Sequence, residues 1–223
     1  MSSQAGNPWF SWDYIRVNMD TLLAALREHI VLTVAAVLVA ALIAIPLSIV
    51  AHRVRWLTGP LLATTGTLYT IPSLALFAFL APFTGLNYST VLIGLVLYAL
   101  LIVLRGSLTG LQQVPLEVKE VAAGMGYGKL AALWRVELPL ALPSIMTGLR
   151  IATVSTVALV TVGEIVGIGG FGTVILGGFR NNFYRAQIMT GTLACVALAF
   201  VLDFLLVLLA RAITPWTRPR RSA

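Results

Sequence analysis

The hydrophobic and polar positions of this chain alternate in long blocks. Apolar runs of a length that suits a membrane span, about 20 residues, are separated by short stretches rich in arginine, glycine and polar side chains. This pattern predicts an all-α integral membrane protein with about five core transmembrane helices. The runs lie at residues 30–51, 57–83, 90–104 with an extension to 111, 140–168 and 188–210.

The second apolar run is interrupted at Thr70-Ile71-Pro72. It is long for one straight span and too short for two full ones. Because proline lacks a backbone N–H and its ring clashes with the preceding turn, a helix that contains it bends or breaks. We therefore expect a kinked helix, or a helix followed by a half-span, with a turn at TGLNYS, residues 84–89.

Aromatic, charged and apolar residues are mixed ahead of the first span, with the apolar ones at helical spacing. We expect residues 1–29 to form an external helix that lies in the membrane interface. The membrane domain then covers residues 30–213, and a basic tail covers residues 214–223. Four early aromatic residues fit an interfacial belt better than a ligand-binding aromatic cage: Trp9, Phe10, Trp12 and Tyr14.

The composition supports a membrane environment. The chain of 223 residues is 59% hydrophobic and only 10% charged, whereas soluble domains carry about 25% charged residues. Its net charge of +7 indicates basic cytoplasmic loops in a membrane protein, so nucleic acid is not an expected partner. The single cysteine excludes an internal disulfide. The spacing of the cysteine, histidines and carboxylates fits neither a metal site nor a catalytic site.

Basic residues divide unequally between the two sides that five spans create, and the richer side is cytoplasmic. The larger set comprises Arg53, Arg55, Arg105, Lys119, Lys129, Arg135, Arg211, Arg218, Arg220 and Arg221. The smaller set comprises Arg16, Arg27, Arg180 and Arg185. We therefore expect the N-terminus outside the cell membrane, and the C-terminus and the polar island after the third span in the cytoplasm.

That island reads EVAAGMGYGKLAALWRVELPLALP, from Glu120 to Pro143. Its Gly-Lys pair suggests a phosphate-binding loop, but the motif G-x-x-x-x-G-K-[ST] fails at Ala123 and Leu130. A second pattern, G-x-G-x-x-G, spans Gly167 to Gly172, yet its flanks are transmembrane and not the strand and helix of a dinucleotide site. Glycines that allow a tight turn or close helix approach explain it better. This outer glycine-rich turn comprises Gly167, Gly169, Gly170 and Gly172.

The island itself reads as two short helices. Pro115 suits a first helical turn, the alternating glycines permit a turn, and Lys129–Glu137 resumes a helix with an apolar face. Leu138-Pro139 is expected to stop that helix, and Pro143 to begin the next span. Such a hairpin is either an ordinary amphipathic loop or a contact surface for a partner protein.

The island resembles the cytoplasmic loop signature of binding-protein-dependent ABC importer permeases. That signature is E-A-A, three residues, G, nine residues, I-x-L-P, and this chain keeps its spacing throughout. Two positions, Val121 and Val136, replace the usual alanine and isoleucine. The matching residues are Glu120, Val121, Ala122, Gly126, Val136, Leu138 and Pro139. The resemblance implies that loop 115–139 is a coupling helix that inserts into a cleft of a cytoplasmic ATPase.

Further likeness, in ELPLALPSIMTGLR at 137–150 and GIGGFG at 167–172, is to the branch that imports osmoprotectants such as glycine betaine, choline, carnitine and proline betaine. It implies a transport subunit that is not itself an enzyme, with ATP and magnesium on a partner ATPase dimer. It also implies a separate extracytoplasmic binding protein and a second permease copy, identical or related. The alternatives are a permease for methionine or another small solute, or a channel or scaffold without an ATPase.

Three charged residues fall inside the apolar runs, where charges are functional candidates. Arg150 and Asp203 lie at similar depths, so we expect them to pair and join two spans; alternatively, Arg150 reaches headgroups and Asp203 meets backbone or water. Glu164 lies near the outer mouth. It either attracts a cationic substrate or pairs with Arg180 or Arg185, and we favour the pair because an uncompensated carboxylate is costly.

Overall fold

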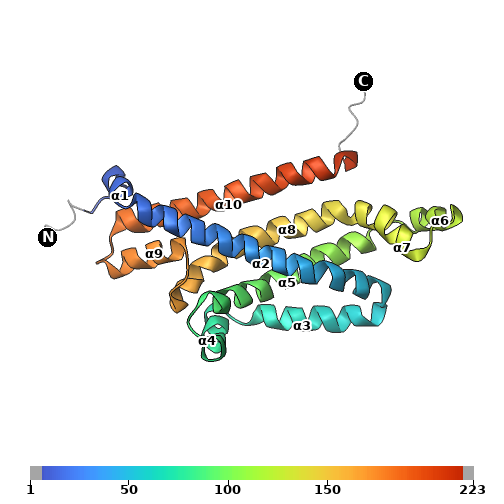
Figure 1. Ribbon diagram of the computed structural model, residues 1–223, viewed down its shortest axis with the longest axis horizontal. Coiled ribbons are helices and arrows are strands. Elements are labelled where there is room, and N and C mark those ends of the chain that lie inside the picture. The colour runs from blue at the N-terminus through green and yellow to red at the C-terminus, as the bar shows by residue number, and fades with distance from the viewer. Residues whose placement is uncertain (1–6, 218–223) are drawn as a thin grey trace, which may run out of the picture.

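The computed structural model describes residues 7–217 and is an elongated helical bundle (Figure 1). Residues 1–6 and 218–223, which include Arg218, Arg220 and Arg221 of the expected tail, lie outside the described part. The elements are α1 (Trp12–Val17), α2 (Met19–Arg53), η1 (Arg55–Leu57), α3 (Thr58–Thr70), α4 (Ser73–Thr84), α5 (Tyr88–Gln112), α6 (Leu116–Gly124), α7 (Lys129–Ala132), η2 (Leu133–Glu137), α8 (Leu138–Val160), η3 (Thr161–Val166), α9 (Phe171–Arg180), α10 (Arg185–Ile213) and η4 (Pro215–Thr217).

The expected number of spans is confirmed. Among residues 7–217, 4 helical stretches are long and apolar enough to cross a membrane, and α3 with α4 forms a fifth candidate that bends by 95° at its break. The break falls at Ile71 and Pro72, as the sequence predicted. The break leaves backbone groups without helical hydrogen bonds. One of them, the carbonyl oxygen of Ile71, accepts a hydrogen bond from the Tyr98 hydroxyl of α5.

Three long helices, α2, α5 and α8, form the core of the bundle. The face of α2 that meets α5 carries small residues at every fourth position, which let the two backbones approach closely. Larger side chains from all three helices fill the layer beside them, including Leu32, Val91 and Val160. Helix α10 packs against α9 and α8 at its start and then diverges from the bundle (Figure 1). Most of its apolar surface is therefore uncovered in the single chain.

Two boundaries differ from the sequence expectation. No break separates an interfacial helix from the first span at residues 29 and 30, because α2 runs continuously over 35 residues from Met19 after the six-residue α1. Leu138-Pro139 does not stop a helix either, so that expectation is wrong. The π-helical turn η2 precedes Pro139, which therefore sits in the first turn of α8, where its missing N–H matters least.

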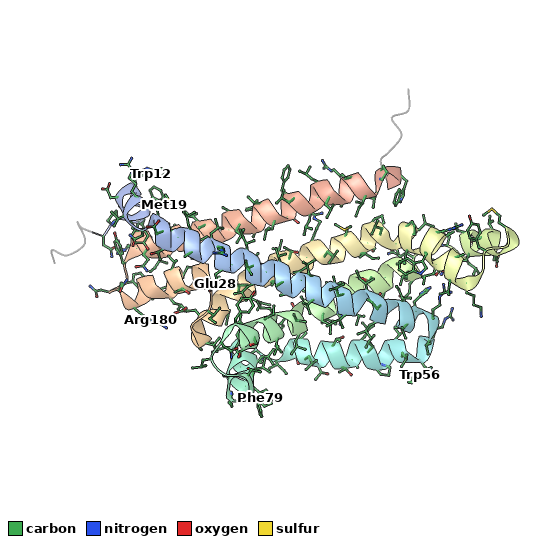
Figure 2. The ribbon with its side chains drawn as sticks, in the orientation of Figure 1. Trp12, Met19, Glu28, Trp56, Phe79 and Arg180 are labelled. Atoms are coloured by element: carbon green, nitrogen blue, oxygen red, sulfur yellow. The ribbon has the colours of Figure 1, made fainter. Side chains whose placement is uncertain are left out.

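The two ends of the bundle carry different elements. Figure 1 shows α6, α7, the α2–α3 connection and the end of α10 at one end, and α1 and α9 at the other. Figure 2 labels Trp56 at the first end, and Trp12 and Arg180 at the opposite end. The described N- and C-terminal segments thus lie at opposite ends, as an odd number of spans requires.

Gly106 of α5 faces Gly148 of α8 at the crossing of these two core helices, and this contact gives a testable prediction. A Cβ atom at Gly106 would lie 2.8 Å from the Gly148 Cα and 3.3 Å from the Ser144 carbonyl oxygen. We expect Gly106→Ala to lower the free energy of unfolding by about 1–3 kcal/mol. Thermal unfolding of the detergent-purified protein measures this loss.

The matched control is Gly59→Ala in α3, where a Cβ would have no atom within 4 Å. This change should leave stability unchanged or raise it by up to about 1 kcal/mol, because alanine favours helix. Equal effects of the two substitutions would show that the glycine crossing does not limit packing.

Candidate functional site

The polar island folds into a helical hairpin at one end of the bundle, formed by α6, α7 and η2 (Figure 1). Helix α6 ends at Gly124, and Gly126, just after the C-cap Met125, adopts the left-handed conformation with φ +83°. The Gly126 N–H donates to the Ala123 carbonyl and the Tyr127 N–H donates to the Ala122 carbonyl. These two bonds form a Schellman motif, which needs a glycine at this position. The glycine of the sequence motif is therefore a helix stop that sets the turn between α6 and α7.

Large apolar side chains point outward from this hairpin. Val121 and Met125 of the first helix are 60% and 65% exposed, and Leu130 and Trp134 after the turn are 75% and 66% exposed. A shallow groove of about 250 Å³ runs along α6 beside them. It is lined by Glu117, Val118, Val121, Ala122, Met125 and Val136. Exposed apolar surface of this kind is typical of a contact with another protein or with a membrane.

Glu137, which the sequence analysis quoted without assigning a role, anchors the hairpin to α2. Its side chain is almost completely buried, and its two carboxylate oxygens lie 2.8 Å from the Arg53 guanidinium and 3.2 Å from Nε2 of His52. Lys119 of α6 approaches the same carboxylate at 3.8 Å. Arg53 also donates a hydrogen bond of 3.1 Å to the Lys129 carbonyl. We call Glu137 with His52, Arg53 and Lys119 the Glu137 cluster.

This cluster joins three separate segments: the last turn of α2, helix α6 and the turn that leads into α8. A buried carboxylate needs such partners because burying an unpaired charge is very costly. The cluster therefore ties the hairpin to two of the core helices, α2 and α8. The sequence does show Glu137 as an acidic residue next to an apolar span, in a segment rich in basic residues. Spacing alone, however, does not connect Glu137 with residues 52 and 53.

Comparison with known proteins identifies the family. Residues 36–219 match the family described as "Binding-protein-dependent transport system inner membrane component". The chain belongs to this permease family. It is 37% identical to a glycine betaine/carnitine/choline transport system permease protein, OpuCD of Bacillus subtilis, over 91% of this chain and 88% of that protein. It is also 33% identical to the carnitine transport permease protein OpuCD of Listeria monocytogenes, over 94% of each chain.

A solved structure shares the fold of the permease. It is an inward-facing conformation of the MetNI methionine ABC transporter, which matches with a TM-score of 0.80 over 88% of this chain and 97% of that chain. The sequence identity is 20%, so this likeness concerns the fold alone. The permease is thus a multi-pass inner-membrane transport subunit.

Arg150 of α8 and Asp203 of α10 form an ion pair inside the permease, the arrangement expected from their depths. The Arg150 Nε and Nη2 atoms donate hydrogen bonds of 2.8 and 2.9 Å to the two carboxylate oxygens of Asp203. The pair lies in an open groove of about 510 Å³ between these helices. Two parallel bonds fix the orientation of both side chains, so they tie the second half of α10 to α8.

Glu164, the third intramembrane charge, is buried in η3 and has two partners. Arg180 of α9 donates a hydrogen bond of 3.2 Å, and the Thr173 hydroxyl donates one of 2.8 Å. Of the two roles considered for Glu164, this geometry matches the ion pair with Arg180. Figure 2 shows Arg180 at the end of the bundle away from the hairpin.

The outer glycine-rich turn is held by two α2 residues that the sequence did not single out, Glu28 and His29. The Gly170 N–H donates to the Glu28 carboxylate at 2.8 Å, and the Phe171 N–H donates to Nδ1 of His29 at 3.2 Å. Nε2 of the fully buried His29 donates to the Val157 carbonyl at 3.0 Å, so the ring is neutral with its proton on Nε2. The turn therefore serves as a packing joint between α2, α8 and α9.

Gly167 and Gly170 both have positive φ values, 83° and 53°. A Cβ at Gly170 would also collide with His29, at 2.7 Å from its Cβ. Glycine is thus required here for backbone geometry and close contact. Within residues 7–217, no group of three or more His, Cys, Asp or Glu side chains is placed to hold a metal ion.

Replacing Glu137 with glutamine tests the Glu137 cluster. The substitution removes the charge that three basic side chains share, so we expect the free energy of unfolding to fall by about 1–3 kcal/mol. This is less than for a fully buried pair, because Arg53 and Lys119 are partly exposed. Chemical or thermal unfolding of the purified permease measures the change. Glu120→Gln, an exposed glutamate of the same hairpin, is the matched control and should change stability by less than about 0.5 kcal/mol.

Charge reversal tests the bond between α8 and α10. Either Arg150→Asp or Asp203→Arg places two like charges side by side, so each single change should lower the melting temperature of the permease. Combining both reversals recreates an ion pair and should recover most of the loss. If the melting temperature of the double variant falls by the sum of the two single losses, the pair does not hold the helices together.

Proposed function

We propose that this permease imports quaternary-ammonium osmoprotectants, such as glycine betaine, choline, carnitine and proline betaine, in an ATP-driven complex. The observation that carries this proposal is the similarity, over nearly the whole chain, to permeases named for glycine betaine, carnitine and choline transport. The chain is also 33% identical to the osmoprotectant import permease protein OsmW of Salmonella typhimurium, over 91% of this chain and 96% of that protein.

In the proposed complex, the hairpin is the docking surface for a cytoplasmic ABC ATPase dimer that binds ATP and magnesium. Its exposed apolar side chains and the groove beside them support this proposal. Each signature residue then has a physical role. Gly126 sets the turn, and Glu120, Val121, Ala122 and Val136 face the partner or line the groove. Leu138 and Pro139 begin α8 and so carry a displacement of the hairpin into the membrane.

The orientation follows from this docking. The hairpin and the C-terminus face the cytoplasm, and the N-terminus faces outward, in agreement with the distribution of basic residues. A separate extracytoplasmic binding protein would deliver the solute to the outer end, near α1 and α9. A second permease copy, identical or related, would complete the pathway and cover part of the apolar surface left open along α10.

Two alternatives are separable by experiment. A permease for methionine or another small solute would use the same hairpin but carry no quaternary amine. A channel or membrane scaffold would need no ATPase, and its hairpin would have no docking role. The exposed Met125 and Leu130, which would serve no purpose on a solvent-facing loop of such a protein, favour the importer.

Reconstitution tests the proposal. The permease is placed in proteoliposomes with its partner ATPase and binding protein, and uptake of labelled glycine betaine and choline is measured. We expect uptake that requires internal ATP, and we expect Met125→Asp to abolish it and to release the ATPase on affinity purification. A charged side chain in the apolar contact would leave an unpaired buried carboxylate, which costs several kcal/mol.

The matched control is Leu86→Asp, which also replaces an exposed apolar residue but at the connection between α4 and α5. This variant should retain the ATPase. Uptake without ATP would favour the channel, and ATP-dependent uptake of another solute with no quaternary amine transport would favour a different substrate class.

A further inference from the structure

Arg105 is a charged side chain within the Tyr88–Gln112 span that has no charged partner among the described residues. Arg105 lies on α5, seven residues before the helix ends at Gln112. Arg150, Glu164 and Glu137 each have an oppositely charged partner within 4.0 Å. Arg105 makes no ion pair and no side-chain hydrogen bond within residues 7–217. An ionised side chain inside a membrane segment is costly and marks a pathway or a ligand site.

Arg105 lines a groove of about 520 Å³ between α3, α5 and α8, a volume in the usual range of small-molecule sites, roughly 300–1,000 Å³. Hydroxyl-bearing side chains line the same groove: Tyr69, Thr70, Thr109, Ser144 and Thr147. Its floor includes Gly106 and Gly148, where the backbones of α5 and α8 meet. The Thr70 and Thr147 hydroxyls donate to carbonyls of their own helices. The groove therefore offers the hydroxyls of Tyr69, Thr109 and Ser144 and one positive charge beside two glycines.

The groove also reaches the break between α3 and α4. Tyr69 and Thr70 are the last two residues of α3, directly before Ile71 and Pro72. Broken helices at membrane depth are tolerated where they line a cavity, and they are common at solute sites of transporters. The end of α3 at the break and Arg105 thus line the same groove.

Tyr69 lines this groove, and its aromatic ring is held in position. Its ring packs edge-on against Tyr98 at a centroid distance of 5.6 Å. Tyr98 is fixed in turn because its hydroxyl donates to the Ile71 carbonyl. A positioned aromatic face attracts a quaternary ammonium within about 6 Å of its centroid.

We propose that this groove is a transient binding site for zwitterionic quaternary amines on their way through the permease. Arg105 would hold the solute carboxylate, for which a guanidinium is suited because it donates two parallel hydrogen bonds. Tyr69 would face the ammonium group. This inference rests on the proposed function. It adds that Arg105 distinguishes solutes with a carboxylate, such as glycine betaine, from choline, which has none.

The test compares glycine betaine and choline uptake in proteoliposomes that contain the full complex. Loss of a charge-assisted contact costs about 1.5–3 kcal/mol, so R105Q should lower glycine betaine uptake at low solute concentration about tenfold or more. Choline uptake should change less than about twofold, and R105K should recover part of the glycine betaine uptake because it keeps the charge. The control is R55Q, which removes an exposed arginine of η1 and should change neither.

Substitutions of Tyr69 test the other half of the site. Y69L removes the ring and should lower uptake of both solutes, because both carry the quaternary ammonium. Y69F keeps the ring and should have little effect. If Y69F and Y69L lower uptake equally, the hydroxyl and not the ring face is needed, and the ammonium contact is overturned.

Several outcomes overturn the role of Arg105 while leaving the proposed function intact. Equal loss of both solutes in R105Q would indicate a structural role or contact with lipid phosphate. Loss of the permease pair in R105Q would indicate a contact with the second copy. A wild-type complex that carries choline but not glycine betaine would also contradict the carboxylate site. If the wild-type complex carries only carboxylated amines, choline cannot serve as the comparison. ATP hydrolysis stimulated by the loaded binding protein is then measured in R105Q, and a value far below wild type would overturn the role of Arg105. A wild-type complex that carries no quaternary amine would overturn the proposed function instead.

Discussion

A lipid bilayer offers no water to a buried polar group, so each break in a helix and each charge in this permease needs a partner within the protein. The Tyr98 hydroxyl satisfies the carbonyl at the α3–α4 break. Glu28 and His29 receive the two N–H groups at the start of α9. The same requirement pairs Glu164 with Arg180 and Asp203 with Arg150. These contacts decide where the spans bend and which helices stay together.

At the hairpin end, the requirement has a mechanical consequence. The buried Glu137 carboxylate is satisfied only when α2, α6 and the turn into α8 are all in place. In addition, the continuous helical path from Lys129 through α8 leaves no flexible linker between the hairpin and the membrane. A partner that pulls on the exposed apolar surface of the hairpin would therefore move two core helices together. Arg105 has no such partner, and we propose that it serves a ligand instead.

Local sequence patterns predicted the elements well and the connections between them less well. Apolar run lengths predicted the spans, and Pro72 the broken helix, because both effects act within one segment. The helix boundary expected at Leu138-Pro139 failed because a π-helical turn, which depends on longer-range packing, accommodates the proline. The role of Glu137 depends on His52 and Arg53, 85 and 84 residues away, and the roles of Glu28 and His29 depend on partners 142 residues away. A single sequence carries no sign of such pairings. Matching depth did predict Arg150 and Asp203, because helix rise alone relates them.

The most direct test of this account is a distance between the hairpin and the end of α2, measured in the working complex. Spin labels are placed on cysteines that replace the exposed Ala123 of α6 and the exposed Trp56 of η1, three residues after α2. Cys195 is replaced by serine, and labelled permease is diluted with unlabelled copies. The account predicts one narrow distance distribution that is the same in the resting and the ATP-trapped complex, because the Glu137 cluster fastens the hairpin to α2. A distance that shifts or broadens when ATP binds would contradict it.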